Sequence, residues 1–375
     1  MSVAALCEML NKQDGYDVSV YTTTSNGKEE LPVIPNRECL VGGVKVTYFR
    51  RITKDNSHFS PALIRTLWKT CNNYNIIHIH AWWNMVSILA CSVAVLKKKK
   101  VIVSPRGTLS TYSFGNKKSF LKSTYHNLIG RKLLEKCNFV VTSEKEKNEI
   151  LQLLQPKAIY IANNLVDFPE YKTSIIFRNI NAPLKLLFLS RIEQKKGLEY
   201  LFEALHKCNF PYQLNIAGTG QDEYINELKQ KVKQYNNERF INWLGGIYAE
   251  KKFEFLESHD LLVLPSQDEN FANVVIESLA MGTPVLISEN VGLEKYVREK
   301  KLGWVCKTNP GSIAEQLKII NESRGELDEI RSKAKKIIKE DFDKSKIVKD
   351  YLLIYEEILS KKKGYSNRFL LKFSR

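Results

Sequence analysis

Two glutamates, Glu269 and Glu277, bracket the part of this sequence whose residues are best suited to bind a charged ligand. From Leu264 to Ser288 the chain reads LPSQDENFANVVIESLAMGTPVLIS: an apolar run, a polar loop and then an apolar helical segment. Free N–H groups where that helix starts, near Asn270, suit a phosphate. Glu277 lies within the apolar helix, where a carboxylate requires a polar partner such as a sugar hydroxyl. A structural salt bridge at Glu277 and a plain helix cap at Asn270 explain the same pattern, so both interpretations stay open.

A basic cluster lies upstream in FLSRIEQKKGLEYL, from Phe188 to Leu201. It places Arg191, Lys195 and Lys196 between the end of a predicted strand and the start of a helix. Guanidinium and ammonium groups at that edge of a sheet can hold a diphosphate. Exposed basic residues at an ordinary turn are the alternative.

A third segment, NIAGTGQDEY, carries Gly218 and Gly220 after a predicted strand. A single G-x-G pair is weak evidence for phosphate binding, because a tight turn also needs it. The third glycine of a dinucleotide-binding fingerprint is absent, and the sequence contains no P-loop, nucleophile-elbow or H-E-x-x-H pattern.

Polar residues also follow two predicted strands in the first half of the chain. His78 and His80, in IIHIHAWWN, alternate along a strand and therefore lie on one face. No third ligand lies near them, so no metal site is predicted. In VIVSPRGTLS, Arg106 follows the next strand and is placed to meet an anion across an interdomain cleft, with a plain turn as the alternative.

The elements that carry these residues alternate between short apolar runs and amphipathic segments. This pattern is typical of parallel sheets covered by helices on both faces. In the first half, the sequence predicts strands at Val18–Thr22, Ile76–Ile79, Val101–Ser104, Phe139–Thr142 and Ala158–Ile161, and helices at Ser2–Asn11, Pro61–Cys71 and Ser119–Lys136. After residue 180 it predicts strands at Leu184–Leu189, Gln213–Ala217, Phe240–Leu244, Leu261–Pro265 and Pro284–Ser288, and helices at Leu198–Cys208, Asp222–Asn236, Ala249–Ser258 and Val274–Met281. The fold class is therefore α/β, with two Rossmann-like, doubly wound domains facing a cleft.

The two series define the expected domains. Residues 1–175 are assigned to an N-terminal domain and 176–344 to a C-terminal domain, with a linker within Asp167–Pro183. A final helix, 345–362, has apolar residues at helical spacing and is expected to pack back on the N-terminal domain. Beyond it, Phe369–Leu371 lies among basic residues and could contact anionic lipid, with a disordered tail as an equal alternative.

Composition narrows the class of partner and the compartment. The chain has 57 Lys and Arg against 41 Asp and Glu, and the net charge of +16 favours anionic partners. The basic residues are spread along the chain without a known nucleic-acid-binding module, so no specific nucleic acid is predicted. The seven cysteines include no C-x-x-C pair and fit a reducing cytoplasm. No signal peptide or membrane-spanning run is recognised.

Taken together, these motifs resemble the GT-B glycosyltransferases of family four, the large retaining group. The resemblance covers nearly the whole chain and is strongest in E-x7-E, Glu269 to Glu277, followed by S-L-A-M-G-T-P-V. Arg191 and Lys196, in R-x4-K-G, stand at the expected distance upstream.

The resemblance implies a role for each of these residues. Arg191 and Lys196 would neutralise the diphosphate of a nucleotide-sugar donor, such as a UDP- or GDP-sugar. Glu277 would hold the ribose, and Glu269 would lie near the donor sugar as a catalytic residue together with Arg106. The other implied donor-binding positions are Gly218, Asn270, Phe271, Ala272, Asn273 and Val274. No metal cofactor is expected, because the cations stabilise the leaving diphosphate.

The sequence departs from this family at three points. Many relatives have histidine where Arg106 stands and glycine where Ala272 stands. Relatives also open with a strand and a Gly-Gly loop, whereas Met1 falls where the first helix begins. We therefore expect the first strand of the N-terminal domain to be missing, through an upstream start or a truncation.

The implied activity is transfer of a hexosyl-type sugar, with retention, to a glycan or lipid-linked acceptor. The setting would be surface polysaccharide or lipopolysaccharide biosynthesis, in the cytoplasm or on the inner face of the plasma membrane, in peripheral contact with anionic lipid. A nucleotide-sugar epimerase or another enzyme on the GT-B fold is the alternative.

Overall fold

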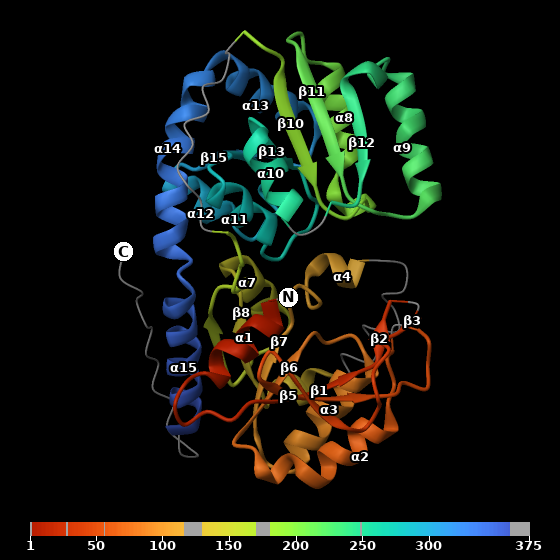
Figure 1. Cartoon of the computed structure of the whole chain (residues 1–375), viewed down its shortest axis with the longest axis vertical. Coiled ribbons are helices and arrows are strands. Elements are labelled where there is room, and N and C mark those ends of the chain that lie inside the picture. The colour runs from red at the N-terminus through yellow and green to blue at the C-terminus, as the bar shows by residue number, and fades with distance from the viewer. Residues whose placement is uncertain are drawn as a thin grey trace. The chain divides into compact units, whose positions relative to one another are not determined.

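A computed structural model describes residues 2–27, 29–55, 57–115, 130–169, 181–247 and 250–360 of the chain (Figure 1). The chain divides into two compact units. Unit 1 consists of Met1–Val141, Lys147–Ala162 and Ser345–Arg375, and unit 2 of Thr142–Glu146 and Asn163–Lys344. Most of the predicted linker, most of the predicted helix Ser119–Lys136 and the whole tail after residue 360 lie outside the described residues.

Unit 2 is built on a six-stranded parallel sheet of order β12-β11-β10-β13-β14-β15. Its strands are β10 (Leu184–Leu189), β11 (Tyr212–Ala217), β12 (Ile241–Gly245), β13 (Leu261–Leu264), β14 (Val285–Ser288) and β15 (Gly303–Cys306). The chain starts in the middle and winds outwards in both directions, which confirms the doubly wound prediction for this half. The short β15 was not predicted; at Gly303 a Cβ would lie 2.1 Å from Val285 O, so glycine permits this pairing.

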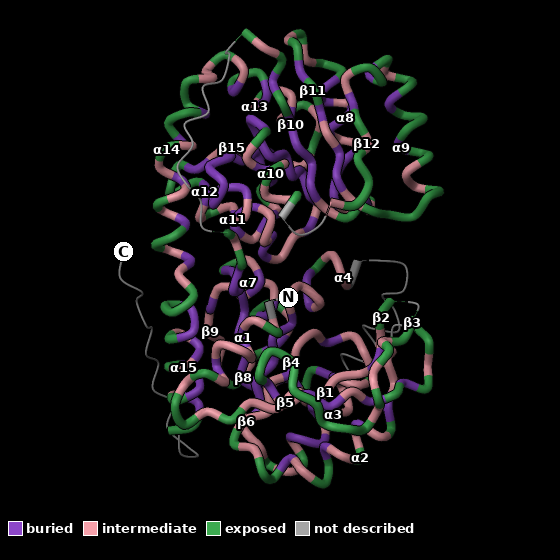
Figure 2. Tube along the Cα trace, in the orientation of Figure 1, coloured by how far each residue is buried: buried purple, intermediate pink, exposed green. Residues whose placement is uncertain are grey.

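The helices of unit 2 form two packed groups around this sheet. They are α8 (Leu198–His206), α9 (Asp222–Gln234), α10 (Glu250–Ser258), α11 (Asn273–Ala280), α12 (Glu294–Lys300), α13 (Pro310–Glu322) and α14 (Arg324–Asp341). Helix α8 contacts α9 and α13, whereas α11 contacts α10 and α14. The strands between the groups are largely buried, as the purple segments of Figure 2 show. This burial explains their nearly continuous apolar sequences.

Unit 1 contains two sheets. The larger is parallel, of order β6-β7-β8-β9, with β6 (Ile76–His80), β7 (Lys100–Ser104), β8 (Asn138–Val141) and β9 (Ala158–Ile161). In the smaller, β5 (Val44–Phe49) pairs in parallel with β1 (Ser19–Thr23) and antiparallel with β4 (Glu38–Val41). Strands β4 and β5 were missed, because β4 is exposed throughout and β5 mixes polar with apolar residues. A short hairpin joins β2 (Ser25–Asn26) to β3 (Glu29–Glu30).

The helices of unit 1 flank these sheets. They are α1 (Ser2–Asn11), α2 (Pro61–Thr70), α3 (Met85–Leu96), α4 (Thr111–Gly115), α6 (Arg131–Leu134), α7 (Glu144–Leu153) and α15 (Lys344–Ser360). Helix α15 is tied to the larger sheet by hydrogen bonds from Tyr355 Oη to His78 Nδ1, 2.8 Å, and from Tyr160 Oη to Glu357 Oε1, 3.0 Å. Within the described part of the chain, no helix is both long and apolar enough to cross a membrane.

Candidate donor-binding site

Lys196 and Glu269 form an ion pair at the carboxyl ends of neighbouring strands. Lys196 is 5% exposed and ends a 3-10 turn, Gln194–Lys196, that follows β10. Gly197, at φ 73°, comes next, and a Cβ there would lie 2.2 Å from Pro265 O. Glycine thus lets the loops after β10 and β13 pack closely, which brings the ammonium to the carboxylate.

Arg191 lies elsewhere on the same edge of the sheet. Its side chain is 67% exposed, and Nη1 contacts Glu193 Oε1 at 2.7 Å. An exposed pair of this kind contributes little to stability and breaks readily. The structure therefore joins Lys196 to Glu269 but not to Arg191, and the shared diphosphate role of the two cations stays a prediction.

Glu277 contacts Lys252, a residue that the sequence reasoning missed. The distance from Lys252 Nζ to Glu277 Oε1 is 2.8 Å, and the two side chains are 22% and 13% exposed. Lys252 lies on α10, which packs against α11. No spacing rule links these helices, because only their tertiary packing brings them together. The salt-bridge interpretation of Glu277 thus has a named partner, while its second oxygen can still accept a hydrogen bond.

The turn between β13 and α11 is held by its side chains. Asn270 Nδ2 donates to Thr142 Oγ1 at 2.9 Å, and Ser143 Oγ donates to Asn270 O at 3.3 Å. The Phe271 ring is 3% exposed and packs edge-on against Phe342. Asn270 and Phe271 can therefore offer a ligand mainly their backbone.

Helix α11 starts from a strained residue. Ala272 has φ 64° and ψ 72°, a left-handed backbone conformation that glycine adopts more readily than alanine. It also lacks a side-chain cap. Asn273 Oδ1 accepts from Asn164 Nδ2 at 3.2 Å, and Val274 is partly exposed. Val275 N already donates to Ala272 O at 2.9 Å, so the N–H groups of Asn273 and Val274, which precede the first intrahelical bonds, are the ones at the α11 start that suit an anion.

Gly218 and Gly220 serve close packing between two loops. A Cβ at Gly218 would lie 1.8 Å from Ser190 O, and one at Gly220 would lie 2.3 Å from Ile192 O. Ile192 N also donates to Thr219 O at 2.8 Å. Close approach between the two loops accounts for both glycines, and ligand binding at Gly218 stays a prediction.

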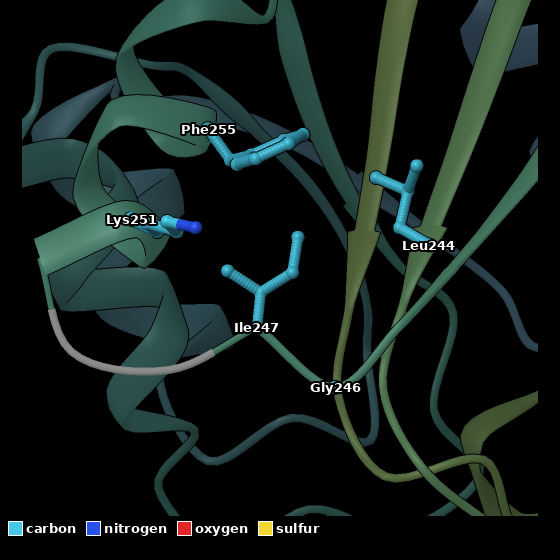
Figure 3. Close-up of a pocket in the computed structure, with 5 residues that line it drawn as sticks. All are labelled: Leu244, Gly246, Ile247, Lys251 and Phe255. Carbon is cyan, nitrogen blue, oxygen red and sulfur yellow. The ribbon is translucent and has the colours of Figure 1, made fainter.

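A cavity of about 450 Å³ opens beside α10 (Figure 3). Leu244, Gly246 and Ile247 line it from β12 and the loop after it, and Lys251 and Phe255 from α10. Leu244, Ile247 and Phe255 give it apolar walls, and Lys251 adds an ammonium. Lys251 directly precedes Lys252, the partner of Glu277, on α10. Such a lining suits a flat, partly polar group.

In unit 1, a hydrogen-bonded chain holds His78 in one tautomer. Ser104 Oγ donates to Val140 O at 2.8 Å, so it accepts from His78 Nε2 at 2.9 Å. His78 Nδ1 must then accept from Tyr355 Oη. Burial, and secondarily the Arg106 cation, lower the pKa of His78 to about 3, so the ring is neutral at physiological pH.

Arg106 and His80 lie beside these hydrogen-bonded residues. Arg106, at φ 52°, donates from Nε to His80 Nδ1 at 3.3 Å. Burial lowers the pKa of His80 as well, with smaller contributions from His78 and Arg106. Within the described residues, no group of three or more His, Cys, Asp or Glu could hold a metal ion.

The chain matches known families over most of its length. A model described as Glycosyltransferase Family 4 matches residues 1–168, and one described as Glycosyl transferases group 1 matches residues 174–337. The architecture is the GT-B fold of glycosyltransferases. The chain belongs to the group 1, or family 4, glycosyltransferases and is a transferase enzyme.

Similar proteins include an uncharacterised glycosyltransferase of Methanocaldococcus jannaschii, 26% identical over 76% of each chain. An uncharacterised 41.2 kDa protein of the Klebsiella pneumoniae cps region is 22% identical over 83% of this chain and 87% of its own. Among solved structures, sucrose-phosphate synthase of Thermosynechococcus elongatus has a TM-score of 0.71 at 18% identity, covering 96% of this chain and 92% of its own. HepE of Anabaena, in complex with UDP and glucose, has a TM-score of 0.68 at 18% identity, covering 85% of this chain and 87% of its own.

Proposed function

We propose that this enzyme transfers a hexosyl residue from a UDP-sugar, or alternatively a GDP-sugar, to a hydroxyl of a glycan or lipid-linked glycan, with retention. The observation that carries the proposal is the Lys196–Glu269 ion pair, which unites the two strongest motifs at one edge of the unit 2 sheet. The UDP in the HepE structure favours UDP as the first nucleotide to test.

Each donor group has a candidate site within unit 2. Lys196 would stabilise the diphosphate, and so would Arg191 once its exposed ion pair with Glu193 breaks. The α11 start would bind a phosphate or sugar oxygen. Glu277, oriented by Lys252, would accept from the ribose hydroxyls. The apolar cavity on α10 is large enough for the base. Glu269, which its ion pair with Lys196 orients, would contact the sugar.

Transfer exchanges one C–O bond for another at the anomeric carbon. The bond to the acceptor oxygen forms as the bond to the diphosphate breaks, and the acceptor proton passes to the departing phosphate on the same face. Lys196 stabilises the charge that develops on this leaving group. Arg106 of unit 1 supplies a second cation for a substrate oxyanion.

Surface polysaccharide assembly is the pathway class we propose. The support is similarity to the Klebsiella protein from a cps region and to WcaL of Escherichia coli, named as a putative colanic acid biosynthesis glycosyltransferase. WcaL is 25% identical over 44% of this chain and 43% of its own.

The test is a sugar-nucleotide panel with nucleotide release and nucleotide binding as readouts. Glu277→Ala should weaken UDP binding about tenfold or more, since it removes charge-assisted hydrogen bonds. Glu254→Ala, at an exposed position on α10, is the matched control and should bind UDP as the unmodified chain does. No nucleotide binding by the full chain, or equal binding by both variants, would sink the proposal.

We also propose peripheral contact with anionic membranes through a surface on α2 and α3. Trp68 and Leu96 are 46% and 70% exposed, and Lys97 Nζ lies 4.3 Å from the centroid of the Trp68 ring. Lys98 and Lys99 follow. An exposed aromatic ring and an exposed aliphatic side chain next to lysines fit an anionic lipid interface.

Vesicle sedimentation tests this surface. Binding to phosphatidylglycerol-containing vesicles should fall when Trp68→Ala and Lys97→Gln are combined, whereas Lys229→Gln on α9 should leave it unchanged. Equal binding of both proteins would reject this surface, and loss of binding only after removal of residues 361–375 would assign the contact to the tail.

A further inference from the structure

The His80 ring carries a hydrogen-bond donor that has no partner among the residues that the structure describes. A guanidinium only donates, so His80 Nδ1, which receives the Arg106 Nε–H, must be the lone-pair nitrogen. The ring proton is then on Nε2. No hydrogen bond to His80 Nε2 is present among the described residues, although the ring is partly buried. This partly exposed donor is open to an acceptor that the described residues do not supply.

The direction of this donor is fixed by the neighbouring groups. The His80 ring lies against the His78 ring, with centroids 4.2 Å apart and planes tilted by 30°. His78 is itself held between Tyr355 and Ser104. Flipping the His80 ring would replace the Nδ1 lone pair with Cδ2–H opposite the Arg106 N–H, so one orientation is favoured.

His80 and Arg106 lie where ligand sites of parallel sheets usually lie. His80 ends β6 and pairs in register with Ser104, which ends β7 two residues before Arg106. Ligands of open α/β sheets bind beyond these carboxyl ends. Ala81 and Arg106 both have left-handed backbones, at φ 63° and 52°, although neither is glycine. Such strain persists where a fixed side-chain geometry is needed.

We propose that His80 and Arg106 together bind an oxyanion, a phosphate or a carboxylate, carried by the acceptor substrate. His80 contributes Nε2–H, and Arg106 contributes its guanidinium, which His80 Nδ1 orients. The inference rests on the proposed transferase function and adds the chemical class of the acceptor to it. Burial lowers the pKa of His80, so the ring stays neutral. Nδ1 can then accept from Arg106 while Nε2 donates to the ligand.

The acceptor, rather than the donor, is the ligand that these residues fit. The candidate groups for the donor diphosphate, ribose and sugar all lie in unit 2, on the loops and helices after β10 and β13. His80 and Arg106 lie on the sheet of unit 1, which has its own carboxyl edge. An acceptor with an oxyanion should be preferred over its neutral analogue by about ten- to a hundredfold in kcat/KM.

Histidine-selective ¹⁵N NMR of the full chain with saturating UDP tests the site directly. Methyl phosphate and glucuronate should each shift the His80 ring resonances, and neutral methyl glucoside should not. Bound UDP occupies the cationic groups of the proposed donor site, so the added anion cannot cause the shift by binding in unit 2. His206, exposed on α8, is the internal control, and its resonance should stay in place.

Two variants separate binding from folding. Arg106→Gln should abolish the shift. His80→Asn keeps an acceptor near the Nδ1 position for Arg106 but loses the Nε2 donor. Its affinity for methyl phosphate should therefore fall about tenfold. The Arg106 ¹⁵Nε resonance reports this binding, because the variant has no His80 signal. His206→Asn is the matched control. UDP affinity, whose candidate groups lie in unit 2, should stay within about twofold in all three variants, and slow hydrolysis of the sugar nucleotide should stay unchanged in His206→Asn.

The outcomes distinguish this inference from the proposed function. UDP binding with no His80 shift by either anion overturns the inference and leaves the transferase intact. A His80 shift without any sugar-nucleotide binding or turnover removes the transferase proposal, and with it the acceptor assignment. Loss of UDP-sugar affinity in both His80→Asn and Arg106→Gln, with anion binding unchanged, would assign the pair to the donor and also overturn it.

Discussion

Lys196 and Glu269 form an ion pair although they stand 73 positions apart in the sequence. One follows the central strand β10 and the other follows its neighbour β13, so adjacent parallel strands deliver them to the same edge of the unit 2 sheet. A cation and a carboxylate placed there can act on opposite ends of a sugar–phosphate bond. The pair is thus the point at which two sequence motifs become one candidate site.

Replacement of Lys196 should separate its electrostatic role from its structural one. In Lys196→Gln, kcat/KM for a sugar nucleotide should fall about a hundredfold, because one charge that stabilises the leaving diphosphate is lost. Lys196→Arg should recover part of this loss. Steady-state kinetics with the thermal midpoint measured alongside gives the readout, and Lys207→Gln, exposed at the end of α8, serves as control. An unchanged kcat/KM in Lys196→Gln would contradict the donor role.

Gly218 should be sensitive to a single added methyl group. In Gly218→Ala the new Cβ would start 1.8 Å from Ser190 O, so the loops after β10 and β11 must separate, at a cost above about 2 kcal/mol of unfolding free energy. Urea unfolding measures it. Gly325→Ala, on α14 with no atom within 4 Å of its Cβ, should be neutral or stabilising by less than about 1 kcal/mol. Equal stability of the two variants would show that Gly218 has another role.

Ala272 offers a test of the strain at the α11 start. A residue with a Cβ at φ 64° is disfavoured by about 1 kcal/mol. The unfolding free energy of Ala272→Gly should therefore lie between a few tenths of a kcal/mol below and about 1 kcal/mol above that of the unmodified chain. Ala272→Val should be less stable than the unmodified chain by more than about 1 kcal/mol, because a β-branched residue fits this conformation poorly. Thermal and urea unfolding of both variants would decide; a valine variant as stable as the glycine variant would exclude strain.

His78 should make the stability of unit 1 depend on pH. Burial, followed by the Arg106 cation, lowers its pKa to about 3 in the folded state, against about 6.5 when unfolded. The unfolded chain therefore binds the extra proton between these values, and unfolding free energy falls as pH decreases from about 6.5, by at most about 1.4 kcal/mol per pH unit. Above about pH 6.5 this contribution is fully present.

The measurement is urea unfolding at several pH values between about 7 and 4.5, a window set by the two pKa values. His78→Gln should be less stable at the upper end but should lose less stability on acidification. Parallel curves for the two proteins would show that His78 does not cause the dependence.

The alternation of apolar runs and helical segments was enough to predict two α/β halves with parallel sheets, because a parallel sheet buried on both faces requires continuous apolar strands. Double winding is present in the unit 2 sheet, whereas the larger unit 1 sheet runs in sequence order from β6 to β9. In unit 2 the predicted strands β10, β11, β12, β13 and β14 agree with the structure within a residue or so. The smaller sheet of unit 1 could not be predicted in the same way. Its strand β4 is exposed throughout, so its sequence carries no burial pattern.

The sequence by itself determined which residues could bind a donor, since Arg191, Lys196, Glu269 and Glu277 carry the right charges after predicted strands. Only the tertiary structure decided their partners: Lys196 meets Glu269, Arg191 meets Glu193, and Glu277 meets Lys252. Likewise, the alternation of His78 and His80 put both on one face, but the proton of each ring depends on Tyr355 and Arg106. The physical reason is that residue type sets what a side chain can donate or accept, whereas packing between distant segments decides what lies within hydrogen-bonding distance.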